Sequence, residues 1–232
     1  MGAACLVGST GLVGSQVLNL LLSENAISSI HAFARGKLSA DAKLEVVSNA
    51  DSSDWPNHFP PTCSVFISAL GTNARKAGGF ANQRKIDYEL NLALAKAAKA
   101  QGVRIYVLIS TAGANVDSII PYAKMRGELD EAIKAVDFEH TIILRPGLLV
   151  GTRSDSRPGE YAGRRMATFL GWISGDRLKD PWAQDAHVVA KAALSAALEA
   201  LEGKNTEKMR LLSQSDIIRL GRTEWRGSGL DS

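Results

Sequence analysis

Positions 3–14 read AACLVGSTGLVG, an apolar run that ends in a glycine-rich turn, and apolar residues at helical spacing follow at 16–22. A strand that passes through a glycine turn into a helix N-terminus is the geometry that binds a dinucleotide pyrophosphate. Free N–H groups at the helix start and the positive end of its dipole face the anion. The alternative is a glycine turn with a structural role only. The predicted nucleotide-binding residues of the turn are Gly8, Ser9, Thr10, Gly11, Leu12, Val13 and Gly14.

Strand and helix patterns alternate along the rest of the chain. Apolar runs predict five more strands, at 30–34, 44–47, 64–71, 105–109 and 141–144, and helices at 87–101, 122–135 and 188–201. Repeated alternation of this kind is typical of a doubly wound parallel sheet. We therefore expect an α/β Rossmann fold, with one domain over residues 1–232. Residues 147–186 carry few strand patterns, and we expect them to form a small C-terminal region of substrate-side loops.

Composition excludes several classes of protein. The 232 residues are 45% hydrophobic and 22% charged, with a net charge of +3 and no long basic run, which argues against nucleic acid as a partner. The two cysteines, Cys5 and Cys63, are expected to be reduced thiols. No uninterrupted apolar stretch reaches the ~18 residues that span a bilayer. Nor do His, Cys and Asp residues have the spacing of metal ligands, so we expect no metal.

The end of the second strand indicates which dinucleotide is bound. An acidic residue there would hold the ribose 2′-hydroxyl of NAD, whereas an arginine accommodates the 2′-phosphate of NADP. This chain has Arg35, with Lys37 nearby and no carboxylate before Asp41. The pattern favours NADP, and the alternative is a solvated surface arginine. Asp51, just past the third strand, is expected to accept from the adenine amino group, unless it only shapes a turn.

The candidate catalytic residues lie between the strand at 105–109 and the following helix. Ser110 and Thr111 end the strand, and Tyr122 opens the helix. A tyrosine here can protonate a carbonyl oxygen during hydride transfer if a cation lowers its pKa of about 10. Arg126 lies one helical turn after Tyr122 on the same face, whereas Lys124 lies on another. The alternative is that Tyr122 is an amphipathic surface residue.

These features together resemble the short-chain dehydrogenase/reductase superfamily, of the extended or atypical kind. The chain is most similar to the branch that includes the human Tat-interacting oxidoreductase and its fungal relatives at the mitochondrial outer membrane. The similarity covers nearly the full chain and is most specific at SRPGE, residues 156–160. It extends to LGTNARKAG at 70–78, RGEL at 126–129, LRPG at 144–147 and IIRLGRTEW at 217–225.

The resemblance implies an NADP-binding fold in which Tyr122 matches the active-site tyrosine and Ser110 or Thr111 its hydroxyl partner. The superfamily has lysine four residues after that tyrosine, where this chain has Arg126. Arginine keeps the charge but is longer and planar, so the two are not interchangeable. The remaining expected cofactor contacts are Ala69, Leu70 and Gly71, at the end of the strand predicted at 64–71, and Pro146, after the strand at 141–144. The alternative for Pro146 is that it only shapes the turn.

Two functions follow as expectations. One is an NADP(H)-dependent oxidoreductase that acts on a small carbonyl or alcohol substrate, with Tyr122 as acid and base. The other is a nucleotide-binding regulatory or scaffold protein that meets protein partners at a membrane surface and turns over little. The resemblance implies peripheral attachment to the cytosolic face of the mitochondrial outer membrane. The first strand begins too early to leave room for a signal peptide or presequence.

Overall fold

The central element of the structure is a seven-stranded sheet in the order β3-β2-β1-β4-β5-β6-β9, in which every neighbouring pair is parallel. The computed structural model describes residues 2–150 and 183–225 of the chain. The strands are β1 (Gly2–Val7), β2 (Ile27–Ala34), β3 (Leu44–Ser48), β4 (Cys63–Ser68), β5 (Ile105–Ile109), β6 (His140–Leu144) and β9 (Met209–Leu212). The α/β fold of the Rossmann type is confirmed.

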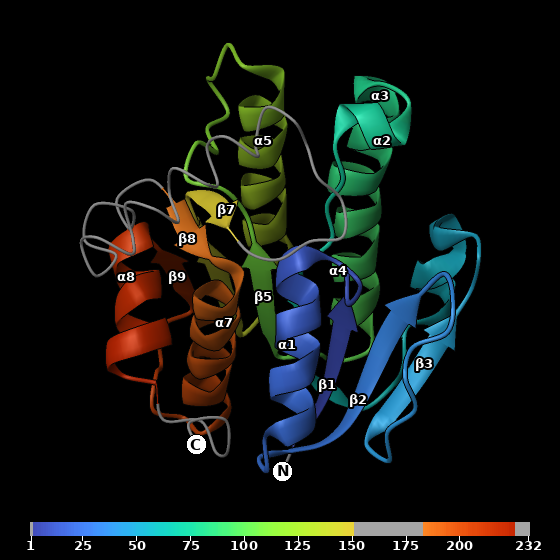
Figure 1. Ribbon diagram of the computed structural model, residues 1–232, viewed down its shortest axis with the longest axis vertical. Coiled ribbons are helices and arrows are strands. Elements are labelled where there is room, and N and C mark those ends of the chain that lie inside the picture. Colours follow the sequence, from blue (N-terminus) through green and yellow to red (C-terminus); the bar gives the residue numbers. More distant parts are fainter. Residues whose placement is uncertain (1, 151–182, 226–232) are drawn as a thin grey trace.

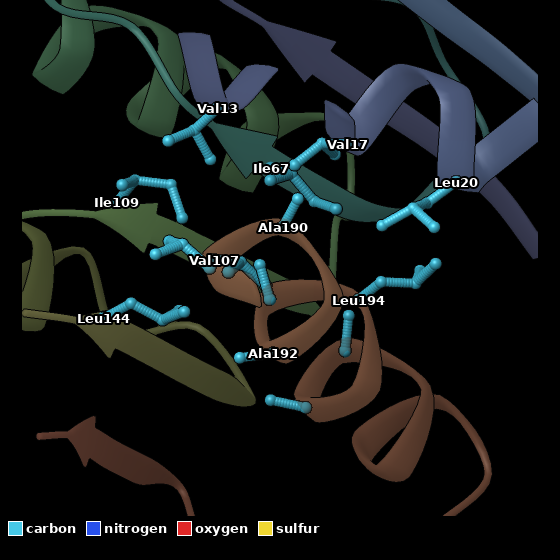
Figure 2. Packing of buried hydrophobic residues seen from close by; sticks show 14 of the residues in the cluster. Val13, Val17, Leu20, Ile67, Val107, Ile109, Leu144, Ala190, Ala192 and Leu194 are labelled. Carbon is cyan, nitrogen blue, oxygen red and sulfur yellow. The ribbon is translucent and has the colours of Figure 1, made fainter. Parts of the chain in front are cut away.

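Long helices cover both faces of the sheet (Figure 1). One face is packed by α1 (Leu12–Ser23) and α7 (Ala186–Leu201), whose apolar side chains meet those of the central strands. Figure 2 shows Val13 and Val17 of α1 and Leu194 of α7 beside Ile67 and Val107 of the sheet. The other face is packed by α4 (Asn91–Ala100) and α5 (Pro121–Val136). Strands buried on both faces are continuously apolar, and β5 is buried at every residue.

Shorter elements connect these layers. A 3-10 helix, η1, covers Ser52–His58, and α2 (Ala74–Ala77) and α3 (Phe80–Arg84) precede a π-helical turn, η2 (Lys85–Leu90), which continues into α4. The last elements are α8 (Gln214–Ile218) and the π-helical η3 (Arg219–Thr223). The pair β7 (Leu148–Val150) and β8 (Ala183–Asp185) forms a second, two-stranded sheet.

Several predicted bounds differ from the observed ones. β2 begins three residues before the predicted strand, and β4 ends at Ser68 rather than at 71. The helix predicted at 87–101 is the π-helical η2 followed by α4. β9 is not predicted at all. The two ends of 147–186 form strands instead of loops, whereas the middle of that region, with the 156–160 motif, lies outside the described residues.

The sheet order decides where a ligand can bind. β1 is followed along the chain by β2 on one side, and the chain then crosses back to place β4 on the other side. In open parallel sheets, ligands bind outside the carboxyl ends of the strands at this reversal. The glycine turn follows β1 at that point.

Candidate functional site

The glycine turn leaves no space for side chains at two positions. Gly8 has φ +84°, and a Cβ atom there would lie 2.5 Å from the carbonyl oxygen of Ala69. A Cβ atom on Gly14, in the first turn of α1, would lie 2.0 Å from the carbonyl oxygen of Gly8. The Gly11 N–H donates to that same oxygen at 2.8 Å. The turn is therefore folded back against the start of α1 and the end of β4.

Polar groups in this turn are suited to an anion. α1 begins at Leu12, so the N–H groups of its first turn have no partner within the helix. Its first turn carries no acidic residue. The Ser9 hydroxyl is buried and has no hydrogen-bond partner among the residues that the structure describes. A buried hydroxyl without a partner is costly, and a phosphate oxygen would satisfy it. These residues fit the pyrophosphate of a dinucleotide.

The other predicted cofactor residues lie at the same edge of the sheet. Arg35 follows β2 directly and is exposed. Ala69 and Leu70 follow β4, and the Ala69 N–H donates to the Val7 carbonyl at 3.0 Å, which holds this segment beside the glycine turn. Asp51 accepts from the Ser53 N–H at 2.9 Å as the N-cap of η1. Asp51 thus has a structural role, and its contact with adenine stays a prediction.

Pro146 and Gly71 complete the predicted set. Pro146 is buried after β6, and its carbonyl accepts the N–H of Ala112 at 2.9 Å, which ties the segment after β5 to the segment after β6. Gly71 is exposed, and a Cβ atom there would lie 4.0 Å from the Asp87 carboxylate. These contacts are within the protein, so the roles of Pro146 and Gly71 in cofactor binding stay predictions.

Ser110 belongs to a buried network of charged groups. Its hydroxyl donates to Oδ1 of Asp130 at 2.7 Å. The second oxygen of Asp130 accepts from Nε of Arg145 at 3.0 Å and from its Nη2 at 2.9 Å. The Asp130 side chain is fully buried, and that of Arg145 is 24% exposed. Ser110 at the end of β5, Asp130 on α5 and Arg145 after β6 thus form one connected chain.

Arg126 lies deeper than the sequence alone suggested. It is 3% exposed and donates through Nη2 to the carbonyl oxygen of Ile109, at the end of β5. Its Nε is buried and has no hydrogen-bond partner within residues 2–150 and 183–225. Burial raises the pKa of the Asp130 carboxyl, whereas the Ser110 hydroxyl and the positive charge of Arg126 lower it. The positive charge of Arg126 therefore favours the ionised form of a buried carboxyl group.

Asp87 is a second buried carboxylate, contributed by η2. It accepts from the Thr72 N–H at 2.7 Å and from the Gln83 amide at 3.1 Å. Burial raises its pKa, and the hydrogen bond from Gln83 is the largest opposing effect. Thr72 and Gln83 thereby fix the segment after β4 to the start of the long helix. A nearby pair, Ser68 and Asn91, makes a buried hydrogen bond of 2.5 Å beneath it.

Tyr122 and Thr111 are more exposed to solvent than Ser110 and Arg126. Tyr122 is the second residue of α5 and is 42% exposed. Tyr122, Arg126 and Asp130 are spaced four residues apart and follow one side of α5, from its exposed beginning to its buried middle. Thr111 is half-buried, and its carbonyl accepts the Ala114 N–H at 3.1 Å. Ser110 is the hydroxyl that joins the charged network.

Sequence reasoning missed Asp130, Asp87 and the bond between Asp130 and Arg145. The spacing from Tyr122 through Arg126 to Asp130 was a usable signal, because residues four apart share a helix face. For Asp87 the spacing from Gln83 gave the same kind of signal, but its partner Thr72 is distant in sequence and is reached through a backbone N–H. Within the described residues, no cluster of three His, Cys, Asp or Glu side chains could hold a metal ion.

Comparison with known proteins identifies the family. The HIM1 family model matches residues 52–171 of the chain. The chain is 46% identical to protein fmp52-1, mitochondrial, of Aspergillus terreus, over 96% of this chain and 100% of that protein. The chain belongs to the HIM1 family. Within the family, protein fmp52, mitochondrial, of Aspergillus fumigatus is 45% identical over 95% of this chain and 99% of that protein.

The solved structures that resemble this HIM1 member show the same fold at low identity. MoeE5 in complex with UDP-glucose and NAD superposes with a TM-score of 0.66 and 15% identity, over 91% of this chain and 75% of that one. WbmH of Bordetella bronchiseptica in complex with NAD+ gives 0.63 and 15%, over 92% and 75%. These likenesses show that the fold is shared.

The relatives of the HIM1 member carry mitochondrial names. In the part of the chain that the structure describes, no helix is both long enough and apolar enough to cross a membrane.

Proposed function

We propose that this HIM1 member binds NADP(H) at the glycine turn and acts as a short-chain dehydrogenase-type oxidoreductase on a small carbonyl or alcohol substrate. The observation that carries the proposal is the turn itself, where Gly8 and Gly14 exclude side chains and the buried Ser9 hydroxyl has no partner in the described part of the chain. That two of the similar solved structures hold NAD supports a nicotinamide dinucleotide.

The roles of the residues follow from their places. The N–H groups at the start of α1 bind the pyrophosphate, and exposed Arg35 meets the 2′-phosphate. When bound, the nicotinamide supplies or accepts a hydride. Tyr122 gives a proton to the substrate oxygen, or takes one from it, at its phenolic oxygen. Ser110 or Thr111 holds that same substrate oxygen in place.

Cofactor choice tests the proposal. Isothermal titration with NADPH and NADH should show tighter binding of NADPH to the wild type, and Arg35→Ala should lose affinity for NADPH selectively. Lys43→Ala serves as the matched control, because it also removes a cation. The Lys43 amino group donates to the Glu24 carbonyl, which precedes β2, whereas Arg35 follows the other end of that strand. Equal affinities in the wild type would refute the NADP assignment.

A second function is favoured by the position of Arg126. Its guanidinium is buried against the Ile109 carbonyl, and its positive charge acts on the buried Asp130 carboxyl, whereas catalysis by Tyr122 calls for a cation close to the phenolic oxygen. This arrangement supports a nucleotide-binding regulatory or scaffold protein with protein partners and little turnover. The two functions share the nucleotide site and differ in catalysis.

Enzymatic turnover distinguishes the oxidoreductase from the scaffold. Oxidation of NADPH is followed at 340 nm with a panel of aldehydes and ketones. An oxidoreductase should lose its activity by about 10²-fold or more in Tyr122→Phe and keep it in Tyr88→Phe, a matched change of a half-buried tyrosine on η2. Nucleotide binding without turnover on any substrate favours the scaffold.

The location proposed for this chain is the cytosolic face of the mitochondrial outer membrane, with peripheral attachment. The mitochondrial names of its relatives and the similarity to an outer-membrane branch support it. Carbonate extraction of isolated fungal mitochondria should release the protein into the soluble fraction. Resistance to carbonate would refute peripheral attachment, and protection from added protease in intact mitochondria would refute the cytosolic face.

A further inference from the structure

The bond between Ser110 and Asp130 determines which way the serine hydroxyl points. Arginine has only donors, so the Asp130 oxygen that receives both Nε and Nη2 of Arg145 must accept both bonds. Two contacts of 2.9–3.0 Å from one guanidinium are those of an ion pair, in which the carboxyl group is ionised. An ionised carboxylate has no proton to donate. The proton in the 2.7 Å bond therefore belongs to Ser110.

A serine hydroxyl has one proton and two lone pairs. Because Asp130 takes the proton, Ser110 has only lone pairs for any other partner. Ser110 lies at the carboxyl end of β5, directly after Ile109, and keeps 8% of its surface exposed. A ligand that meets this oxygen must itself donate a hydrogen bond. The hydroxyl of an alcohol can do so, whereas the carbonyl oxygen of a ketone or aldehyde cannot.

We propose that Asp130 is a positioning residue that fixes Ser110 as a hydrogen-bond acceptor, so that the site prefers the hydroxyl of an alcohol ligand over the carbonyl of a ketone. This inference rests on the proposed function, because it assumes that substrate binds beside Ser110. It goes further by naming the alcohol form as the better ligand and Asp130, held by Arg145, as the residue that decides it.

The substitution Asp130→Asn reverses the polarity with almost no change of shape. Arg145 only donates, so the amide must turn its oxygen toward Arg145 and its NH₂ group toward Ser110. Ser110 then accepts from the amide, and its own proton becomes available to the ligand. The variant should bind ketones better than the wild type, whereas alcohols should bind about equally well, because a hydroxyl can accept a hydrogen bond as well as donate one. Glu131→Gln is the matched control, because it changes an exposed carboxylate at the next position of α5.

Binding is measured by ¹⁵N NMR titration of the NADP⁺-loaded protein with two probes that cannot react there, 1-methylcyclohexanol and cyclohexanone. The tertiary alcohol has no hydrogen on its carbinol carbon, and the ketone meets no hydride donor. The ratio of alcohol to ketone affinity should fall by about tenfold in Asp130→Asn, since one net hydrogen bond is worth about 0.5–1.5 kcal/mol. Glu131→Gln should keep the wild-type ratio. Ser110→Ala removes the hydrogen bond to the ligand, so the remaining ratio should reflect only how the two hydrocarbon rings pack in the site.

A second measurement locates the proton directly. Neutron diffraction from perdeuterated crystals should show deuterium on Ser110 Oγ directed at an ionised Asp130, and directed away from residue 130 in Asp130→Asn. A deuteron on the Asp130 carboxyl overturns the inference, as does an unchanged affinity ratio in the variant or no binding of the alcohol. Failure of NADP⁺ to bind would instead count against the proposed function, and the neutron result would still decide the polarity of Ser110.

Discussion

At the scale of single residues, Asp87 and Asp54 provide two carboxylates in opposite environments. Asp87 is 1% exposed, and burial raises its pKa above the unfolded value of 3.8. Asp54 lies on the surface, where hydrogen bonds from Asn57 and then His58 lower its pKa. The two groups must therefore contribute to the pH dependence of stability with opposite signs.

For Asp87 the folded protein holds a proton at pH values where the unfolded chain has already lost it. Its contribution to stability is therefore present at low pH and falls as the pH rises from 3.8 through the higher native pKa. Asp87→Asn removes this titration. We expect the free energy of unfolding of the variant, relative to the wild type, to rise as the pH increases from 4 to 7. Urea unfolding followed by circular dichroism across that pH range measures it.

Asp54→Asn is the control with the opposite sign. The lowered pKa of Asp54 stabilises the fold above the unfolded value of 3.8, and this contribution is lost as the pH falls toward the native pKa. The relative stability of Asp54→Asn should therefore fall with rising pH. Parallel slopes for the two variants would contradict the assignment of burial as the cause at Asp87.

Residues were predictable from the sequence where their role is local. Gly8 and Gly14 could be identified because a turn between strand and helix restricts which side chains fit, and the structure confirms the close contacts. Asp130 was not predicted, because its role depends on contacts between distant parts of the chain. Its partners Ser110 and Arg145 come from the ends of two different strands, and only the register of β5 and β6 brings them together.

At the scale of elements, α5 depends on the absence of a side chain at one position. A Cβ atom on Gly127 would lie 2.4 Å from the carbonyl carbon of Asn115 and 2.5 Å from the Val116 nitrogen. The loop between β5 and α5 thus lies directly on the helix at this point. The Asn115 N–H donates to the Ala123 carbonyl at 3.1 Å and strengthens the contact. The position of this loop bears on the site, because the loop joins Ser110 to Tyr122.

Gly127→Ala is expected to push the loop away from α5 and to cost about 1–3 kcal/mol of stability. The obstacle is backbone rather than a flexible side chain, so the strain cannot be relieved by a rotamer change. Urea unfolding measures the loss, and ¹⁵N chemical shifts should change around Asn115. Gly113→Ala is the control in the same loop, because a Cβ atom there meets nothing within 4 Å. An equal loss in both variants would show that the contact with α5 is not the cause.

Long elements with strong apolar patterns were predicted well, and short ones were not. β5 is buried at every residue and β1 at all but Ala3, and both appear as apolar runs. β9 has only four residues, half of them polar or exposed, and it joins the sheet solely through β6. The π-helical η2 has ordinary helix-forming residues, so nothing local distinguishes it from the α4 helix that follows.

At the scale of the whole molecule, the late strand β9 forms one edge of the same sheet that contains β1. β9 pairs with β6 in parallel, and α8 and η3 then pack against α7 (Figure 1). The Gly221 position shows how close this packing is, because a Cβ atom there would lie 2.2 Å from the Val188 carbonyl oxygen. Trp225 adds a cation–π contact in which the Lys191 ammonium lies 5.3 Å from the ring centroid.

The C-terminal elements are therefore expected to be required for folding. A chain that ends at residue 204 loses the burial of Leu212, Ile217 and Leu220, which are at most 4% exposed. Full burial of three such side chains contributes roughly 5–9 kcal/mol, comparable with the roughly 5–15 kcal/mol that stabilises a typical domain. The truncation also turns β6 into an open edge and uncovers part of α7, and both favour aggregation.

Urea unfolding and size-exclusion chromatography compare this truncation with a chain that ends at residue 225. The longer chain keeps every described element, so it should unfold cooperatively at nearly the same urea concentration as the full protein. The shorter chain should show no cooperative transition and should elute as aggregate. Cooperative unfolding of the shorter chain would contradict the prediction. It would mean that the other six strands of the large sheet, with their helices, bury enough apolar surface without β9, α8 and η3.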